Sequence, residues 1–214
     1  MMHLYIMSNI FTREVLDDFV QKAPELAEYI DKYREKMVLV PNLNDPPTYL
    51  IKAIIHQQLS LRAASAIEQK FENIFGKMEI EEIVSTDLQK MRECGLSKSK
   101  CDYVKNVAKA FYDGELSDMT NLDAYKDMTT KQIRKKFTSV KGIGEWTAHM
   151  FCIFNLGKLD VLASGDLGVK KGIQTMYKLD DLPTPRMVKQ TAKHWGELAT
   201  VGTFLCWRVL EDNN

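Results

Sequence analysis

The chain has 214 residues, of which 45% are hydrophobic and 27% charged, and 29 basic residues balance 29 acidic ones. This ordinary globular composition excludes disordered and collagen-like chains, and no apolar run is long enough for a membrane helix. The four cysteines lie far apart without a Cys-x-x-Cys pair, which argues against a zinc finger or an iron–sulfur loop and favours reduced thiols in an intracellular compartment.

Apolar residues recur at helical spacing along most of the first half of the chain. In chain order, helices are predicted at 12–35 with a split at Pro24, 46–57, 60–75, 79–84, 86–93 and 98–112. Asp45 before two prolines, Thr86 and Ser97 are each expected to cap the helix that follows. A break around 57–60 is expected to separate two consecutive helices.

The second half continues the helical pattern. Helices are predicted from Thr129 or Thr130 to Phe137, and at 145–154, 167–176, 185–194 and 198–211. No β-α-β alternation is present, which disfavours a parallel α/β fold. The sequence therefore predicts an all-α protein built of short helices and tight turns.

Although the net charge is zero, basic residues are clustered in three places along the chain. Residues 131–141 hold five basic side chains and no acidic one, three lysines surround the turn at 95–97, and Lys170 and Lys171 follow Asp166. A basic cluster is often no more than a solvated helix face. Each of these three clusters, however, lies beside a glycine turn that opens a helix, which favours a surface that binds anions.

The segment VKGIGEWTA at 140–148 is the most informative in the chain. Gly142 and Gly144 present no side chain, each can adopt a positive φ, and a helix follows at once. A helix start with exposed N–H groups binds anions, and the adjacent Lys141 makes phosphate the natural ligand. The alternative is a tight helix–turn–helix that serves packing alone.

Four segments in order, together with Trp207 and Arg208, resemble a known family: residues 45–60, 95–104, 140–148 and 165–172. They are similar to the helix-hairpin-helix, Gly/Pro-rich loop and Asp (HhH-GPD) superfamily of DNA glycosylases, and within it to the 3-methyladenine (alkyladenine) type. The resemblance implies base excision DNA repair by a monofunctional glycosylase, which hydrolyses the N-glycosidic bond of alkylated purines after base flipping.

The resemblance also implies an architecture. It predicts a two-lobed helical fold with the DNA cleft between the lobes. Lobe A would comprise about 1–45 and 175–214, and lobe B about 46–174 with the wedge, the hairpin at 138–148 and the catalytic loop at 163–172. The expected partner is double-stranded DNA with alkylated bases or abasic sites, bound by a monomer without membrane contact. The expected location is the nucleus in a eukaryote and the cytoplasm otherwise.

By this resemblance Asp166 is the catalytic residue. Alkylated purines leave as neutral bases, so a fixed carboxylate that stabilises the oxocarbenium-like sugar or steers a water is sufficient. The alternative role of Asp166 is that of a helix N-cap, and both roles are compatible. Bifunctional relatives carry a nucleophilic lysine where this chain has Trp146, so no strand cleavage is expected.

The remaining site residues follow from the same resemblance. The phosphate-binding group comprises Lys141, Gly142, Gly144, Thr147, Lys170 and Lys171. Gln58 and Leu59 are the expected wedge that fills the space left by the flipped base, and Trp146 and Trp207 the expected aromatic base pocket. No cofactor is required, although main-chain carbonyls of Thr138, Val140 and Ile143 could hold a structural Na⁺ or K⁺.

The chain departs from the family pattern at a few positions. Lys141 and Ala163 each stand where the family has a proline, and the change at Ala163 is expected to loosen the loop that carries Asp166. A weakly active or inactive homologue that binds abasic sites is therefore an alternative. A helical protein-interaction module would leave the two glycines and Asp166 unexplained.

Overall fold

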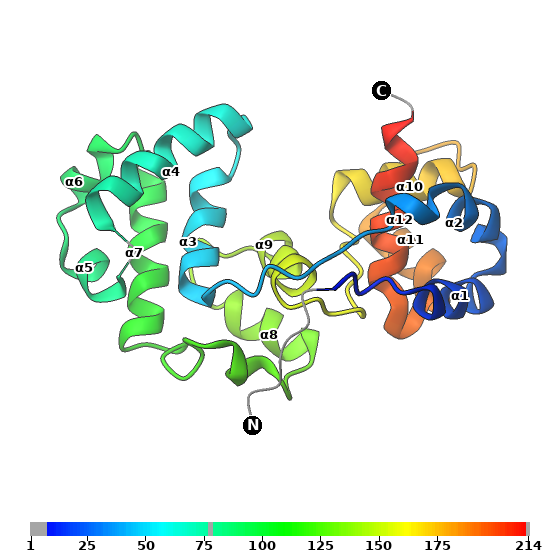
Figure 1. The fold of residues 1–214 in the computed structure, drawn as a ribbon. Coiled ribbons are helices and arrows are strands. Elements are labelled where there is room, and N and C mark those ends of the chain that lie inside the picture. Colours follow the sequence, from blue (N-terminus) through cyan, green and yellow to red (C-terminus); the bar gives the residue numbers. More distant parts are fainter. Residues whose placement is uncertain (1–7, 77–78, 213–214) are drawn as a thin grey trace. The chain divides into compact units, whose positions relative to one another are not determined.

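The computed structural model describes residues 8–76 and 79–212, and within these residues every regular element is a helix (Figure 1). The predicted all-α class is confirmed. The chain divides into two compact units. The first unit contains the described residues up to Asn42 and those from Cys152 onward, and the second is Leu43–Phe151.

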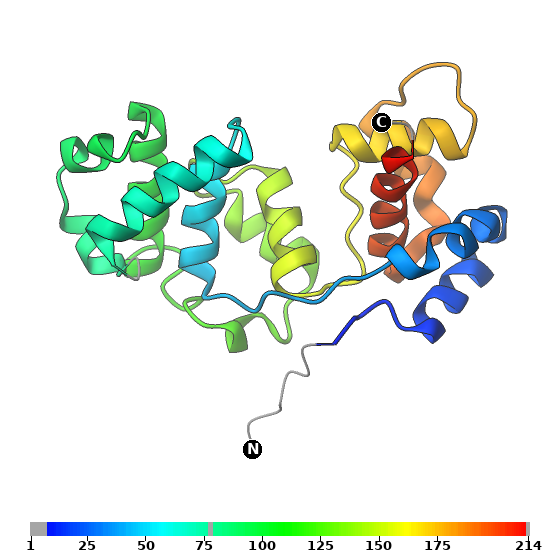
Figure 2. The same ribbon diagram turned by 45° about the horizontal axis from the view of Figure 1, so that its top comes forward.

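This division differs from the predicted lobes in one respect. Residues 152–174, with the loop that carries Asp166, belong with the N- and C-terminal helices rather than with the wedge and hairpin. The reason is close packing of α10 (Leu167–Met176) on α12 (Ala199–Glu211), which lie side by side in Figures 1 and 2. A Cβ atom at Gly172 would collide with the backbone of Cys206, so the two helices touch where Gly172 has no side chain.

The first unit is built from helices at both ends of the chain. Besides α10 and α12, its described elements are α1 (Arg13–Lys22), η1 (Pro24–Leu26), α2 (Ala27–Tyr33), η2 (Arg34–Lys36), α11 (Pro185–Thr191), η5 (Ala192–Leu198) and the π-helical η4 (Phe151–Asn155), whose first residue belongs to the second unit. Its core includes an edge-to-face pair of Phe19 and Trp195, whose ring centroids are 5.8 Å apart. The split predicted at Pro24 is confirmed, since η1 begins there.

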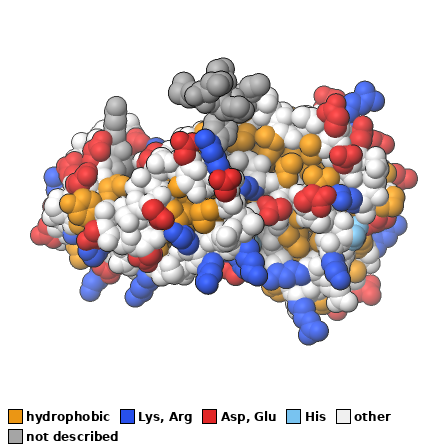
Figure 3. Space-filling view, turned by 90° about the horizontal axis from the view of Figure 1, so that it is seen from below, with side chains coloured by type: hydrophobic (Ala, Val, Ile, Leu, Met, Phe, Trp, Pro, Cys, Tyr) orange, Lys and Arg blue, Asp and Glu red, His pale blue; other side chains and the backbone are white. Residues whose placement is uncertain are grey.

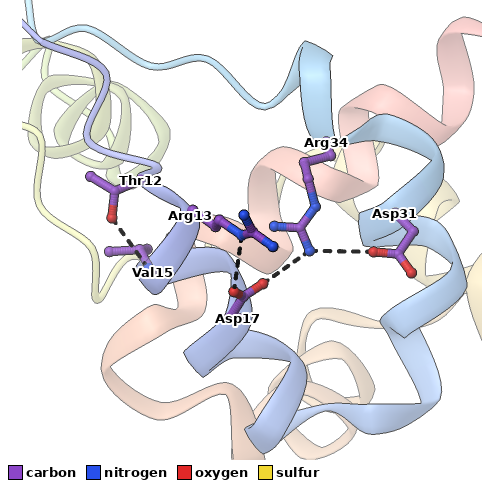
Figure 4. Close-up of polar contacts among 6 residues, drawn as sticks. All are labelled: Thr12, Arg13, Val15, Asp17, Asp31 and Arg34. Atoms are coloured by element: carbon purple, nitrogen blue, oxygen red, sulfur yellow. Dashed lines mark hydrogen bonds and ion pairs between the residues drawn. The ribbon is translucent and has the colours of Figure 1, made fainter.

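An ion-pair network ties α1 to α2 at the surface of this unit (Figure 4). The Nη2 atom of Arg34 lies 3.0 Å from Oδ1 of Asp17 and 3.3 Å from Oδ1 of Asp31. Thr12 caps α1 by accepting a hydrogen bond from the N–H of Val15. Arg34 thus links α1 to α2 through the two carboxylates.

The described residues of the second unit form α3 (Pro46–His56), α4 (Leu61–Phe75), α5 (Ile80–Ser85), α6 (Leu88–Glu93), α7 (Lys98–Tyr112), η3 (Leu122–Tyr125), α8 (Thr130–Phe137) and α9 (Glu145–Met150). The long helix α7 packs against α3, α5 and α6 (Figure 1). Aromatic contacts among Tyr125, Phe137 and Phe151 join α8 to the end of α9. The hairpin between α8 and α9 therefore rests on a buried aromatic cluster.

Three of the predicted capping residues are confirmed. Asp45, Ser97 and Thr129 accept hydrogen bonds from the first turns of α3, α7 and α8, as expected from their side-chain oxygens. The expectation for Thr86 is wrong. Asp87 caps α6, whereas the hydroxyl of Thr86 donates to the carbonyl of Glu82 at the end of α5.

None of the helices in the described residues combines the length and the apolar character needed to cross a membrane. In the same part of the chain, no three His, Cys, Asp or Glu side chains come together in a way that could hold a metal ion.

Candidate nucleic-acid interface and catalytic loop

The turn between α8 and α9 uses its two glycines for different reasons. Gly142 has φ of +116°, and a Cβ atom there would lie 2.6 Å from Cβ of Tyr103. Gly144 has φ of −89°, so of the two glycines only Gly142 uses the positive φ that both can adopt. Beyond its two chain neighbours, no atom of the described residues would lie within 4 Å of a Cβ at Gly144, the N-cap of α9. The backbone at the helix start is thus open to a ligand.

Two side chains, one at the C-terminal end of α3 and one in α7, donate hydrogen bonds to the main chain of this turn. The carbonyl of Lys141 accepts a hydrogen bond from Asn106 Nδ2 at 3.2 Å, and the carbonyl of Gly142 accepts one from Gln57 Nε2 at 3.4 Å. The same Gln57 nitrogen lies 3.4 Å from Oγ1 of Thr147, whose residue is only 3% exposed. The side chain of Thr147 therefore faces the protein, and the residue as a whole is buried.

The basic cluster at 131–141 is smaller than its sequence suggests. Arg134 pairs with Glu145 at 2.7 Å, and Lys136 lies 3.3 Å from Asp118, so acidic residues outside the cluster neutralise two of its five charges. Lys131, Lys135 and Lys141 are exposed. On the face shown in Figure 3, acidic and basic side chains lie close together. A phosphate contact at this turn thus depends on few cations.

Two of the three lysines around the turn at 95–97 bond to the main chain of other elements. Lys100 donates to the carbonyls of Ile55 and Gln57, both at 2.7 Å, and so closes the C-terminal end of α3. Its partial burial lowers the pKa of its amine. Lys105 donates to the carbonyl of Val84 at 3.2 Å. Lys100 and Lys105 therefore bond to the ends of neighbouring helices rather than lying free on the surface.

The break predicted between two helices at 57–60 is confirmed. Gln58 has φ of +57°, a conformation that non-glycine residues rarely adopt, and its side chain is exposed. Leu59 is 40% exposed, and Ser60 caps α4. Local strain of this kind is often found at functional sites. The structure thus presents the two expected wedge residues at the tip of a sharp, well-anchored turn.

An ion-pair network joins the two helices that flank this turn. Lys52 of α3 lies 2.7 Å from both Glu68 and Glu72 of α4, and His56 also contacts Glu68. Partial burial raises the pKa of Glu68, but its bonds to Lys52 and His56 outweigh burial, and the net result is a lowered pKa. The wedge turn is therefore held by charge pairs on one side and by Lys100 on the other.

Asp166 lies in the other unit, at the start of α10. Its Oδ1 atom accepts a hydrogen bond from the N–H of Val169 at 2.9 Å and another from the indole Nε1 of Trp207 at 3.0 Å. Asp166 is thus the helix N-cap that the sequence predicts. Two N–H donors therefore hold this carboxylate in place at the start of the helix.

Trp207 is positioned by two residues that sequence reasoning missed. Its ring stacks on Phe154, with centroids 5.8 Å apart and planes inclined by 14°. A Cβ atom at Gly168 would lie 2.8 Å from Cδ1 of Trp207, so only glycine leaves room for the indole. The glycine two residues after Asp166 was the one available sequence signal for this close approach. The structure therefore brings Asp166 and Trp207 together.

The other predicted residues are placed as follows. Lys170 and Lys171 lie in the first half of α10, and Lys171 is exposed. Trp146 is 51% exposed in the first turn of α9. In the loop before Asp166, buried Ala163 donates its N–H to Thr203 Oγ1 at 3.4 Å, a bond that proline could not make. The substitution thus exchanges the stiffness of a proline ring for a hydrogen bond.

Comparison with known proteins bears directly on this site. The family model for "HhH-GPD superfamily base excision DNA repair protein" matches residues 51–197. DNA-3-methyladenine glycosylase 1 of Schizosaccharomyces pombe is 30% identical over 187 residues, which cover 86% of this chain and 80% of that protein.

Solved structures agree with the sequence comparison. A DNA-3-methyladenine glycosidase from Bacillus halodurans is 28% identical with a TM-score of 0.80, and the match covers 93% of this chain and 90% of that one. The S. pombe 3-methyladenine DNA glycosylase in complex with abasic DNA is 26% identical with a TM-score of 0.72, covering 92% and 97%. The chain belongs to the HhH-GPD superfamily of base excision DNA repair proteins.

Proposed function

We propose that this base excision repair protein is a monofunctional DNA glycosylase that removes alkylated purines from double-stranded DNA. The observation that carries the proposal is the carboxylate of Asp166, held by the N–H of Val169 and the indole of Trp207 at the start of α10. Relatives similar over most of their length are named as 3-methyladenine glycosylases, which supports the substrate class.

The proposed chemistry needs no cofactor. An alkylated purine is a good leaving group because it departs as a neutral base, while the deoxyribose gains oxocarbenium character. Asp166 would stabilise that positive charge or orient the attacking water. Trp146 stands at the position of the nucleophilic lysine in bifunctional relatives, so no Schiff base forms there and the product is an intact strand with an abasic site.

The proposed DNA contacts use both units. Main-chain N–H groups at Gly144 and Thr147, with Lys141 beside Gly142, would bind phosphate at the start of α9. Lys170 and Lys171 would add cationic contacts. Gln58 and Leu59 would enter the vacated stack after base flipping. Trp146 in the second unit and Trp207 in the first are electron-rich rings of the kind that stack on electron-poor bases.

A monovalent cation at the hairpin is part of the proposal. Main-chain carbonyls of Thr138, Val140 and Ile143 are oxygen ligands of the kind that Na⁺ and K⁺ accept. The carbonyl of Val140 already accepts the N–H of Ile143 at 3.1 Å, and its second lone pair suits a cation. Such an ion would offset the charge of the bound phosphate. The proposed location is the nucleus in a eukaryotic cell and the cytoplasm in a bacterial one.

The test compares excision with binding. Purified protein is incubated with methylated duplex DNA, and abasic sites are revealed as strand breaks only after heat or alkali. A parallel titration measures affinity for a duplex with an abasic-site analogue. Breaks that require alkali support the proposal, whereas breaks without alkali would indicate a lyase. Tight abasic-site binding without excision would instead support the alternative, a non-catalytic homologue.

A further inference from the structure

One face of α12 carries three polar side chains directed at a single loop. Thr200, Thr203 and Trp207 are spaced by three and four residues, which places them in one row along the helix. All three bond to the segment 158–166, which ends at Asp166. The sequence alone gave no signal for the role of the two threonines, because threonine within a helix is usually a neutral position.

The two threonine hydroxyls each bridge two main-chain groups of the segment. Thr200 Oγ1 donates to the carbonyl of Lys158 at 2.8 Å and accepts from the N–H of Val161 at 3.0 Å. Thr203 Oγ1 donates to the carbonyl of Val161 at 3.0 Å and accepts from the N–H of Ala163 at 3.4 Å. From Thr200 to Thr203, the bonded positions of the segment therefore move forward by two or three residues.

The third side-chain contact between α12 and this segment is the bond from Trp207 Nε1 to Asp166 Oδ1 at 3.0 Å. Within the loop itself, the N–H of Asp166 donates to the carbonyl of Ala163 at 2.9 Å. A shift of Ala163 along α12 would therefore move the backbone of Asp166 relative to the indole that holds its carboxylate.

Burial of the two hydroxyls fixes the register of the segment 158–166 on α12. Thr200 and Thr203 are both 0% exposed, so water cannot replace a bond that either hydroxyl loses. A slip of the segment by one residue would leave buried N–H and carbonyl groups without partners, which is costly. Valine would fill the same volume, so packing alone does not explain a hydroxyl at these two positions.

We propose that Thr200 and Thr203 are positioning residues for the reaction. They hold the segment 158–166 in one register on α12 and so place the carboxylate of Asp166 against Trp207. Ala163 is the complement of Thr203, because a proline at this position would have no N–H to donate. The inference rests on the proposed catalytic role of Asp166.

The test uses two substitutions at one position. Thr203→Val keeps the shape and removes both hydrogen bonds, whereas Thr203→Ser keeps the hydroxyl and removes a buried methyl group. Thr184→Val is the matched control, since it removes the hydroxyl that caps α11 in the same unit. We expect Thr203→Val to slow single-turnover excision roughly tenfold with unchanged affinity for abasic duplex, since small misplacement of a reacting group costs rate. Thr203→Ser and Thr184→Val should excise at close to the wild-type rate.

A second readout does not depend on activity. The chain has three tryptophans, and Trp207→Phe identifies the indole ¹⁵N–H signal of Trp207 in an NMR spectrum. Thr203→Val should shift this signal and speed its exchange with solvent, whereas Thr203→Ser should leave both unchanged. If Thr203→Val fails to fold, the pair Thr200→Val and Thr200→Ser repeats the test with a smaller expected shift, because its contacts lie farther from Asp166.

The outcomes separate the two claims. Absent excision in the wild type would overturn the proposed function, while the indole signal still tests the positioning role. An indole signal that is the same in Thr203→Val as in the wild type would overturn the positioning role. Equal excision rates in Thr203→Val and Thr203→Ser would overturn it as well.

Discussion

The hairpin in the second unit and the Asp166 loop in the first unit both combine glycines with a helix start, but Gly144 of the hairpin and Gly168 after Asp166 have opposite surroundings. At the hairpin, a Cβ atom at Gly144 would have no atom of the described residues within 4 Å apart from its chain neighbours. At the Asp166 loop, Trp207 occupies the space beside Gly168, and Cys206 occupies that beside Gly172. The same residue type therefore marks a surface open to a ligand in one place and tight internal packing in the other.

Gly172→Ala should have the largest effect on stability. Its added methyl group would meet the backbone of Cys206, which cannot move without displacing α12. We expect a loss of about 3 kcal/mol in the free energy of unfolding, measured by chemical denaturation. Gly144→Ser is the control, because serine is a good N-cap and has open space there. A similar loss in both variants would contradict the comparison.

Gly144→Asp should have the largest effect on DNA binding. It places a negative charge where the N–H groups of α9 are open, so we expect at least a tenfold loss of affinity, about 1.4 kcal/mol. Fluorescence anisotropy at several salt concentrations provides the measurement. Wild-type binding should weaken steeply with salt, and an unchanged, salt-insensitive affinity in the variant would refute the hairpin assignment.

Substitutions in the wedge turn should affect damaged DNA selectively. Leu59→Ala and Gln58→Gly both remove a group that would fill the vacated stack, and glycine suits the φ of +57° at position 58. We expect a severalfold loss of affinity for abasic duplex, little change for intact duplex, and unchanged or higher thermal stability of Gln58→Gly. Equal losses on both duplexes would mean that these residues are structural.

The pH dependence of stability should show the smallest effect. The folded-state pKa of Glu68 is lowered, so its pairing with Lys52 and His56 stabilises the fold above the ordinary glutamate pKa of about 4.5. This contribution, about 1 kcal/mol or less, disappears as the pH falls through the lowered value. Glu68→Gln should therefore flatten the decline of unfolding free energy between about pH 5 and pH 3. Parallel curves for variant and wild type would argue against the pairing.

The sequence predicted the bounds of α7, α8 and α10 because a capping residue marks the start of each: Ser97, Thr129 and Asp166. It did not predict where the two units divide, since this depends on the contact between Gly172 and Cys206 across distant helices. It also could not tell that Lys100 bonds to carbonyls at the end of α3, because a lysine in the sequence carries no information about its partner.

Catalysis at Asp166 is the central claim, and Asp166→Asn tests it most directly. The amide keeps the size of the side chain and can still accept the N–H bonds of Val169 and Trp207, so the fold should remain intact. It removes the charge that would stabilise the oxocarbenium-like sugar, so single-turnover excision from methylated duplex should fall roughly 10²- to 10³-fold. Affinity for abasic duplex should hold or rise in the same preparation. Excision that persists at the wild-type rate would show that another group performs the chemistry.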